Sequence, residues 1–137
     1  MPNSSGSAVS LAGRFLMCLV FIGSGIAKVT AFSMMTGFLA SKGVPLASVA
    51  LGAAAAVEVL GGLAVLAGFK TKIVAWLLFL YLIPTTLLFH NFWTMQGMER
   101  MDNQVHFMKN LAIMGGLLLL AANGASGYSV DSSTAKS

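Results

Sequence analysis

Glu58 is the residue with the clearest chemical consequence, because it is an acid in the middle of a long apolar run, residues 46–69. An ionised carboxylate inside a bilayer is costly unless a partner within the membrane balances its charge. Such an acid can pair with a buried cation or exchange a proton with a bound ligand. Both roles require basic side chains on neighbouring helices.

Two basic residues of the first apolar segment could supply that partner. Gly25 follows Arg14 by 11 residues, and Lys28 follows Gly25 by three. Both spacings are made of helical steps of three and four residues, so the three side chains lie on one helix face. Gly25 leaves room for a neighbouring backbone to approach. We expect this face to lie against Glu58 with Arg14 as its ion-pair partner, while Lys28 and Lys109 compete for that role from the other end.

The composition places these residues in a membrane. Of the 137 residues, 57% are hydrophobic and 9% are charged, and the mean hydropathy is +0.85; soluble domains are roughly 25% charged. We therefore expect an all-α, integral membrane four-helix bundle. Four segments approach the length of about 20 residues that a spanning helix needs. These predicted spans are residues 9–28, 45–69, 73–92 and 105–123.

The remaining segments surround one predicted membrane domain, residues 9–123. Residues 1–8 and the Gly/Ser/Thr-rich tail, residues 124–137, are expected to be disordered. Residues 30–43, between the first two spans, are too few to cross a bilayer, but their apolar residues recur at near-helical spacing. This pattern predicts a short interfacial or re-entrant helix.

The order of the spans brings distant polar residues to one membrane face. Four spans place both termini on one side, and the basic turn with Lys70 and Lys72 favours the cytoplasm on that side. The other face receives the ends of the first and third spans and the starts of the second and fourth. The residues gathered there are Lys28, Lys42, His90, Asn91, Trp93, His106, Lys109 and Asn110.

We therefore predict a polar pocket inside the membrane. Its candidate ligand-binding residues are Arg14, Lys28, Glu58, His90, Lys109 and Asn110. The lysines and the asparagine would donate hydrogen bonds or positive charge to ligand oxygens. Glu58 would anchor the cations or exchange a proton. No residue is assigned a catalytic role.

Each of these residues also has an interpretation without a ligand. A buried pair at Glu58 can fix helix register, and Lys28 and Lys109 can extend to the lipid headgroups. His90 and His106 could bind a metal or haem. However, two interfacial histidines without a third ligand at fixed spacing are usually solvated, so we predict no metal site.

Several functional classes are not supported by the sequence. Cys18 is the single cysteine, which excludes disulfides within the chain and dithiol redox chemistry. No phosphate-binding glycine loop or catalytic triad is present, so an autonomous enzyme is not expected. The net charge is +4, but the basic residues form no stripe, and nucleic-acid binding is not expected.

Short motifs follow one another in a characteristic order along residues 13–131. They are Gly13-Arg14, Gly25 with Lys28, Gly43-Val44-Pro45, Glu58 with Gly61-Gly62, Leu88-Phe89-His90, and Lys109-Asn110 with Gly115-Gly116. In this order and spacing the chain resembles the DoxX family of small four-span bacterial membrane proteins. The resemblance implies a four-helix bundle in the bacterial inner membrane. Some relatives are associated with quinone-linked oxidation of sulfur compounds or with membrane redox and detoxification complexes.

The resemblance and the pocket together suggest a subunit or accessory of a membrane-bound, quinone-linked redox system. The expected cofactor is a bound quinone. The expected partners are the lipid bilayer, a membrane or soluble redox protein and a second copy of the chain. Two alternatives stay open. One is a structural or assembly protein whose buried charges serve packing only. The other is a small transporter or proton pathway in which Glu58 is the carrier.

Overall fold

The computed structural model describes residues 4–135 and is built almost entirely of helices, with no strand among those residues. The elements are α1 (Ser4–Thr30), α2 (Phe32–Ser41), α3 (Ala47–Ala67), α4 (Thr71–Phe89), the 3-10 helix η1 (Phe92–Thr94), α5 (Gly97–Asn123) and α6 (Val130–Thr134). Four long helices, α1, α3, α4 and α5, are apolar enough to cross a membrane. The predicted all-α architecture with four spans is therefore confirmed.

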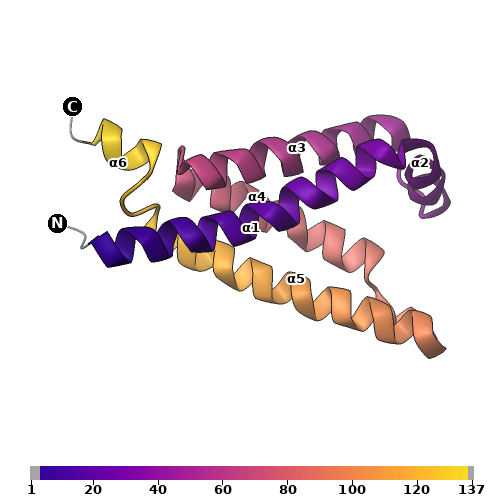
Figure 1. Ribbon diagram of the computed structural model, residues 1–137. Coiled ribbons are helices and arrows are strands. Elements are labelled where there is room, and N and C mark those ends of the chain that lie inside the picture. The colour runs from indigo at the N-terminus through magenta and orange to yellow at the C-terminus, as the bar shows by residue number, and fades with distance from the viewer. Residues whose placement is uncertain (1–3, 136–137) are drawn as a thin grey trace.

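The long helices form two antiparallel pairs, α1 with α3 and α4 with α5 (Figure 1). The short helix α2 lies at the end of the bundle opposite both termini, which confirms the helix predicted between the first two spans. Helix α5 contacts α1 where Met17 lies against Gly116. From there it diverges from α1 toward the α2 end (Figure 1). The bundle is therefore closed at the terminal end and wider at the α2 end.

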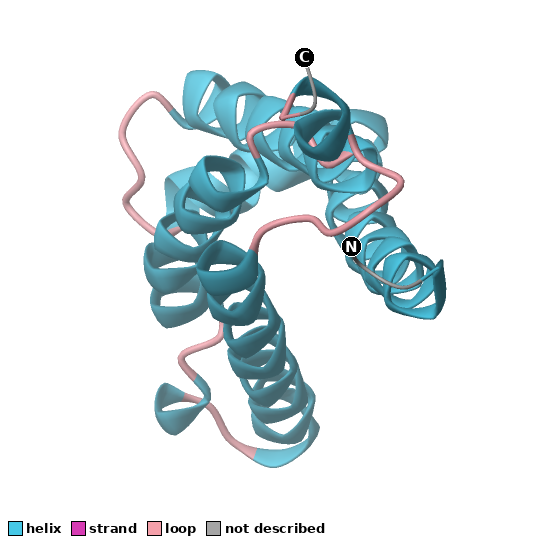
Figure 2. Cartoon of the chain, turned by 90° about the vertical axis from the view of Figure 1, so that its left-hand side faces the viewer, coloured by secondary structure: helices cyan, strands magenta, loops and turns pink. Residues whose placement is uncertain are grey.

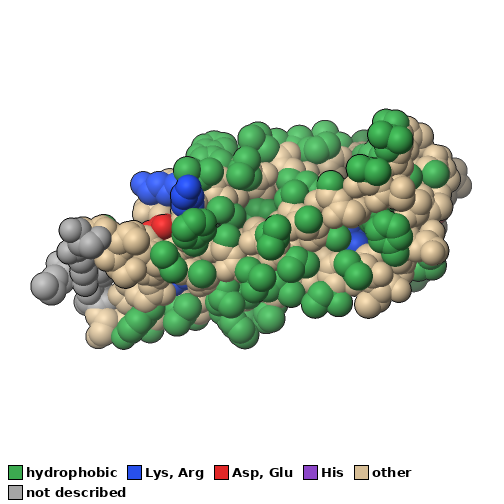
Figure 3. Space-filling model, turned by 90° about the horizontal axis from the view of Figure 1, so that it is seen from above, with side chains coloured by type: hydrophobic (Ala, Val, Ile, Leu, Met, Phe, Trp, Pro, Cys, Tyr) green, Lys and Arg blue, Asp and Glu red, His purple; other side chains and the backbone are tan. Residues whose placement is uncertain are grey.

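The packing of apolar side chains is that of a protein surrounded by lipid. The buried core consists of Phe21, Val65, Ala75, Leu78, Leu82, Leu117 and Ala121. Large apolar side chains such as Leu19, Leu60 and Leu77 are exposed, and hydrophobic side chains spread over the long face seen in Figure 3. A soluble monomer rarely exposes so much continuous apolar surface.

Two helices are longer than the predicted spans. Helix α1 begins at Ser4, so residues 4–8, expected to be disordered, are helical, while residues 1–3 lie outside the described residues. Helix α5 begins at Gly97, about two turns before the predicted start. The predicted bounds came from hydropathy, which indicates only the part of a helix that lies in the hydrocarbon. Polar turns that extend the helix beyond the hydrocarbon have no apolar pattern and were therefore not predicted.

The C-terminal segment is ordered by the turn between α3 and α4. Sequence composition predicted disorder over residues 124–137, but its described part carries α6, which lies over the terminal end of the bundle (Figure 2). The backbone N–H of Asp131 donates to the carbonyl oxygen of Gly68 at 2.9 Å. The Asp131 carboxylate accepts from the backbone N–H of Lys70 at 2.7 Å and of Thr71 at 2.9 Å. A Gly/Ser-rich segment gives no local sign of such tertiary partners.

Candidate functional site

Helices α1 and α3 pack closely beside Glu58. A Cβ atom added to Gly25 would lie 2.6 Å from Cγ2 of Val59 and 3.2 Å from the carbonyl oxygen of Ala55. Only glycine permits this contact without displacing α3. Because side chains tilt toward the N-terminus of their helix, Lys28 extends back from the next turn to the level of Glu58.

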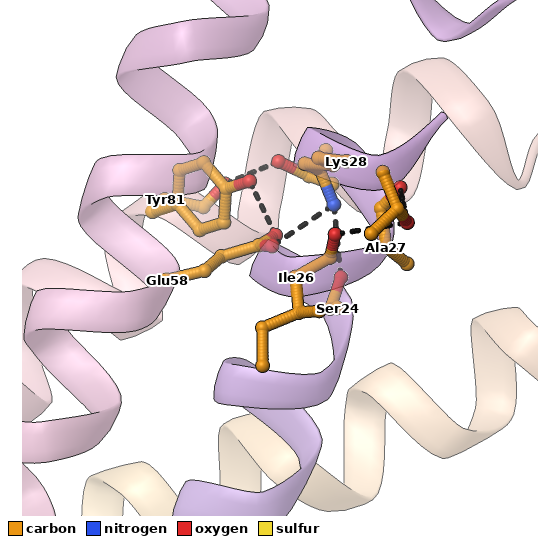
Figure 4. A network of polar contacts seen from close by, with 8 residues as sticks. Ser24, Ile26, Ala27, Lys28, Glu58 and Tyr81 are labelled. Carbon is orange, nitrogen blue, oxygen red and sulfur yellow. Dashed lines mark hydrogen bonds and ion pairs between the residues drawn. The ribbon is translucent and has the colours of Figure 1, made fainter. Parts of the chain in front are cut away.

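Lys28 and Glu58 form a buried ion pair within the bundle. The Lys28 Nζ lies 2.9 Å from Oε2 of Glu58 and also donates to the Ser24 hydroxyl at 2.8 Å. The Tyr81 hydroxyl donates to Oε1 of Glu58 at 2.6 Å. The Glu58 side chain is 4% exposed and that of Lys28 14%. Figure 4 shows the ammonium and the phenol converging on the carboxylate from two helices.

Tyr81 is the partner of Glu58 that the sequence analysis did not identify. It comes from α4, so the carboxylate of α3 is held by side chains from both helix pairs. The available signal was a tyrosine in the middle of an apolar span. A buried phenol usually finds a hydrogen-bond partner, and Glu58 is a buried acceptor of the adjacent span.

The prediction that Arg14 pairs with Glu58 is wrong. Arg14 lies 11 residues before Gly25, about 16 Å along the helix axis, which is beyond the reach of its guanidinium. Instead, Arg14 Nη1 donates to the carbonyl oxygens of Val65, at 3.3 Å, and of Leu66. These carbonyls belong to the last turn of α3, where helical N–H donors run out; that of Val65 also accepts from the backbone N–H of Gly68 at 3.1 Å.

Arg14 also connects α1 to the C-terminal segment. Its Nη2 donates to the carbonyl oxygen of Tyr128 at 2.9 Å, and the residue is 2% exposed. Burial alone would raise the pKa of Asp131, but donors of Thr71 and Lys70 and the positive charge of Arg14 hold that pKa below its ordinary value. Arg14 therefore closes the terminal end of the bundle and lies far from Glu58.

A cavity of about 760 Å³ opens beside the ion pair, between α1, α2, α4 and α5. The polar or charged residues that line it are Ser24, Lys28, Glu58, Thr85, His90, Asp102, Asn103, His106, Lys109 and Asn110. The apolar ones are Val20, Phe21, Met35, Phe38, Leu39, Leu82, Phe89 and Ile113, together with Gly23. Five of the six predicted pocket residues therefore surround one cavity, and Arg14 does not.

Two histidines from different helices lie together at this cavity. The rings of His90 and His106 stack with centroids 5.1 Å apart and an interplanar angle of 25°. Nδ1 of His90 lies 3.0 Å from Oδ1 of Asn103, and Nδ1 of His106 lies 3.2 Å from Nζ of Lys109. Among the described residues, no three His, Cys, Asp or Glu side chains gather as a metal site would require.

Asn110 links two helices at the cavity. It is buried, and its Nδ2 donates to the Thr86 hydroxyl at 3.0 Å. One amide hydrogen is therefore engaged in holding α5 against α4. Lys109, the preceding residue, is exposed and has hydrogens beyond the one directed to His106.

The bundle and its interior define a class of protein: an integral membrane protein with four spans and a charged, hydrogen-bonded cavity within them. Comparison of the sequence with known families identifies the family within this class. The model of the DoxX family matches residues 9–91, and the chain belongs to that family.

Proteins of Escherichia coli and Saccharomyces cerevisiae are among those similar to the chain. It is 33% identical to the inner membrane protein YphA of Escherichia coli (strain K12) over 121 residues, covering 88% of this chain and 86% of YphA. It is 37% identical to the inner membrane protein YqjF of the same strain over 121 residues, covering 88% of each. The ER-derived vesicles protein ERV29 of Saccharomyces cerevisiae is 34% identical over 73 residues, which is 53% of this chain and 24% of ERV29. No solved structure matches.

Proposed function

We propose that this protein is a subunit or accessory of a membrane-bound redox system and that its cavity binds a quinone-like ligand. The observation that carries the proposal is the cavity of about 760 Å³ beside the Lys28–Glu58 pair. Small-molecule sites are typically about 300–1,000 Å³, mostly apolar, with a few convergent polar groups. The cavity has this size. Its lining surface is mostly apolar, although ten of its lining residues carry polar or charged groups.

The distribution of charge favours a neutral or oxygen-rich ligand over a cation. Lys28 already balances the charge of Glu58, so the carboxylate does not need a cationic ligand. Lys109 retains donor capacity beside the cavity, since an ammonium has three hydrogens. This arrangement supports carbonyl or anionic oxygens as the ligand groups and weakens the alternative in which Glu58 carries a cation across the membrane.

The apolar part of the cavity suits a ring with a hydrocarbon tail. The rings of Phe38 and Phe89 lie 5.9 Å apart between centroids, and both line the cavity. The cavity is lined by residues of both α1 and α5, and a ligand dissolved in the bilayer would enter laterally between these helices. The single thiol, Cys18, is buried, so electrons would pass between the bound quinone and a partner protein.

Binding measurements on the reconstituted protein test this proposal. A short-chain benzoquinone should bind saturably to wild-type protein in lipid nanodiscs. Lys109→Ala should weaken binding about tenfold, as loss of a charge-assisted hydrogen bond predicts. Lys72→Ala is the matched control, because Lys72 lies at the start of α4 and outside the cavity. If wild type shows no saturable binding, the assembly alternative is favoured, in which the buried charges serve packing only.

We also propose an inner-membrane location with cytoplasmic termini. Both Escherichia coli relatives are named inner membrane proteins, and the basic turn at Lys70 and Lys72 lies at the terminal end. In a Cys18→Ser background, an impermeant thiol reagent should label Glu99→Cys on intact spheroplasts. Ser133→Cys should be labelled only after permeabilisation. The reverse pattern would contradict this orientation.

A further inference from the structure

The hydrogen bonds around His90 determine which of its ring nitrogens carries a proton. Nδ2 of Asn103 donates to the carbonyl oxygen of Glu99 at 3.0 Å, which fixes the orientation of that amide. Its Oδ1 is therefore the atom 3.0 Å from Nδ1 of His90. An amide oxygen can only accept, so Nδ1 of His90 carries the hydrogen. In the neutral ring, Nε2 is then a hydrogen-bond acceptor.

His106 has the opposite arrangement. Nζ of Lys109 lies 3.2 Å from its Nδ1. A lysine ammonium can only donate, so Nδ1 of His106 accepts and the hydrogen of the neutral ring is on Nε2. His106 therefore offers a donor next to the acceptor of His90.

The two rings lie together at the wall of one cavity. They stack with centroids 5.1 Å apart, they come from the end of α4 and from α5, and both line the cavity. Phe89, the residue before His90, lines the same cavity and pairs with Phe38. A flat ring held against these aromatic faces would present its oxygen substituents to an acceptor and a donor on adjacent helices.

We propose that His90 and His106 form a paired recognition site for the two oxidation states of a quinone-type head group. Nε2 of His106 donates to a carbonyl oxygen of the quinone. Nε2 of His90 accepts the hydroxyl hydrogen of the quinol. The inference rests on the proposed function and assigns the atoms in that same cavity that hydrogen-bond to the ligand. It concerns binding alone, and no bond to a ring nitrogen is formed or broken.

Asparagine substitutions remove one ring nitrogen each. In His90→Asn the side-chain amide takes the place of Nδ1, keeps a donor toward Asn103 and deletes the Nε2 acceptor. In His106→Asn the side-chain oxygen still accepts from Lys109, and the Nε2 donor is lost. The corresponding glutamine variants carry an amide near the Nε2 position and are expected to keep most of the affinity. Met108→Leu is the matched control on α5, since Met108 is exposed outside this cavity.

Three ligands separate the two contacts: a short-chain benzoquinone, its quinol, and the dimethyl ether of the quinol, which has no donor. Binding is measured anaerobically in lipid nanodiscs. His90→Asn should weaken the quinol about tenfold and leave the quinone within about twofold of wild type. His106→Asn should weaken the quinone about tenfold. Affinity for the ether should be unchanged in His90→Asn, and Met108→Leu should bind all three ligands as wild type does.

The outcomes distinguish this inference from the proposed function. If wild type binds the quinone and Lys109→Ala weakens it, but both asparagine variants bind like wild type, the histidine assignment is overturned and the proposed function stands. The assignment is also overturned if each variant weakens quinone and quinol equally. If wild type binds neither ligand, both proposals fail. Helical circular dichroism and the glutamine variants identify any loss caused by misfolding.

Discussion

The two ends of the bundle both bury a charged side chain, but they surround it differently. At the terminal end, the Arg14 guanidinium is directed to backbone carbonyls of Val65, Leu66 and Tyr128, where the helices lie close together. At the α2 end, Lys28 and Glu58 meet at the edge of a cavity of about 760 Å³. Both ends use a cation from α1.

This difference separates a structural charge from one that can serve a ligand. Arg14 is held between carbonyls at the end of a helix, where its charge also complements the helix dipole. Lys28 and Glu58 satisfy one another but border unfilled space lined by further donors and acceptors. Burial of a charge alone, which is all that the sequence indicates, does not distinguish the two cases.

Breaking the ion pair should have the largest effect on stability. Lys28→Met leaves the Glu58 carboxylate buried with only Tyr81 as a partner, and loss of one member of a buried pair costs about 3–5 kcal/mol. The free energy of unfolding in mixed detergent micelles should fall by this amount. Quinone binding should weaken as well, because Glu58 borders the cavity.

The double variant Lys28→Met/Glu58→Gln is the control for this prediction. A neutral glutamine still accepts from Tyr81 and removes the uncompensated charge, so most of the lost stability should return. If the double variant is as unstable as the sum of the two single variants, Lys28 and Glu58 are not energetically coupled.

Removing the cation at the terminal end should be less costly and should spare the cavity. Arg14→Met removes the guanidinium donors from the carbonyls of Leu66 and Tyr128 and leaves that of Val65 with the backbone N–H of Gly68. The expected cost is about 1–3 kcal/mol in the free energy of unfolding. Ligand affinity should stay within about twofold of wild type, a difference of roughly 0.4 kcal/mol. Arg14→Lys, which keeps a charge and a donor, should lose less stability. A large loss of ligand affinity in Arg14→Met would contradict the separation of the two ends.

The fold could be predicted from the sequence because the bilayer imposes simple constraints. Apolar length determined the four spans, and backbone hydrogen bonding in lipid required helices. The ends of α1 and α5 could not be placed, because polar turns outside the hydrocarbon carry no hydropathy signal. The order of α6 also escaped prediction, since it depends on bonds between Asp131 and the distant turn at Gly68.

The candidate site was predicted in part because connectivity brings span ends together. Lys28, His90, Lys109 and Asn110 were expected at one membrane face, and they line one cavity with Glu58. Which cation pairs with Glu58 could not be derived from the sequence, because the pairing depends on the position of each helix along the axis of its neighbour. Arg14 and Lys28 lie on the same face of α1, but a shared face does not specify the height of each side chain along the helix axis.

Removing one hydroxyl should test how much the second helix pair contributes to the charge network. Tyr81→Phe deletes one hydrogen bond to Glu58 and should lower the free energy of unfolding by about 1.5 kcal/mol. The carboxylate stretching band of Glu58 should shift in the infrared spectrum. Tyr128→Phe is the matched control, because Tyr128 contributes its backbone carbonyl to Arg14. An unchanged band in Tyr81→Phe would mean that the phenol does not contact the carboxylate.

Acidification should weaken the terminal end through Asp131. Its pKa is lower in the folded protein than its ordinary value, because donors of Thr71 and Lys70 and the charge of Arg14 outweigh the effect of burial. Stability from this carboxylate is therefore present above the ordinary aspartate pKa of about 3.9 and is lost as the pH falls through the folded value. Asp131→Ala should lose about 1 kcal/mol near neutral pH, as removal of a helix cap does.

The difference in unfolding free energy between wild type and Asp131→Ala, measured as a function of pH, is the sharper test of the contribution of Asp131. The unfolding free energies of wild type and Asp131→Ala should converge as the pH falls below about 4. Protonation of Asp131 in wild type removes the same stabilising carboxylate charge that the substitution removes from the variant. Asp102→Ala, at an exposed acid of α5 beside the cavity, is the matched control and should leave the wild-type acid dependence in place. Parallel curves for wild type and Asp131→Ala across this range would show that the charge of Asp131 does not hold the C-terminal segment against the α3–α4 turn.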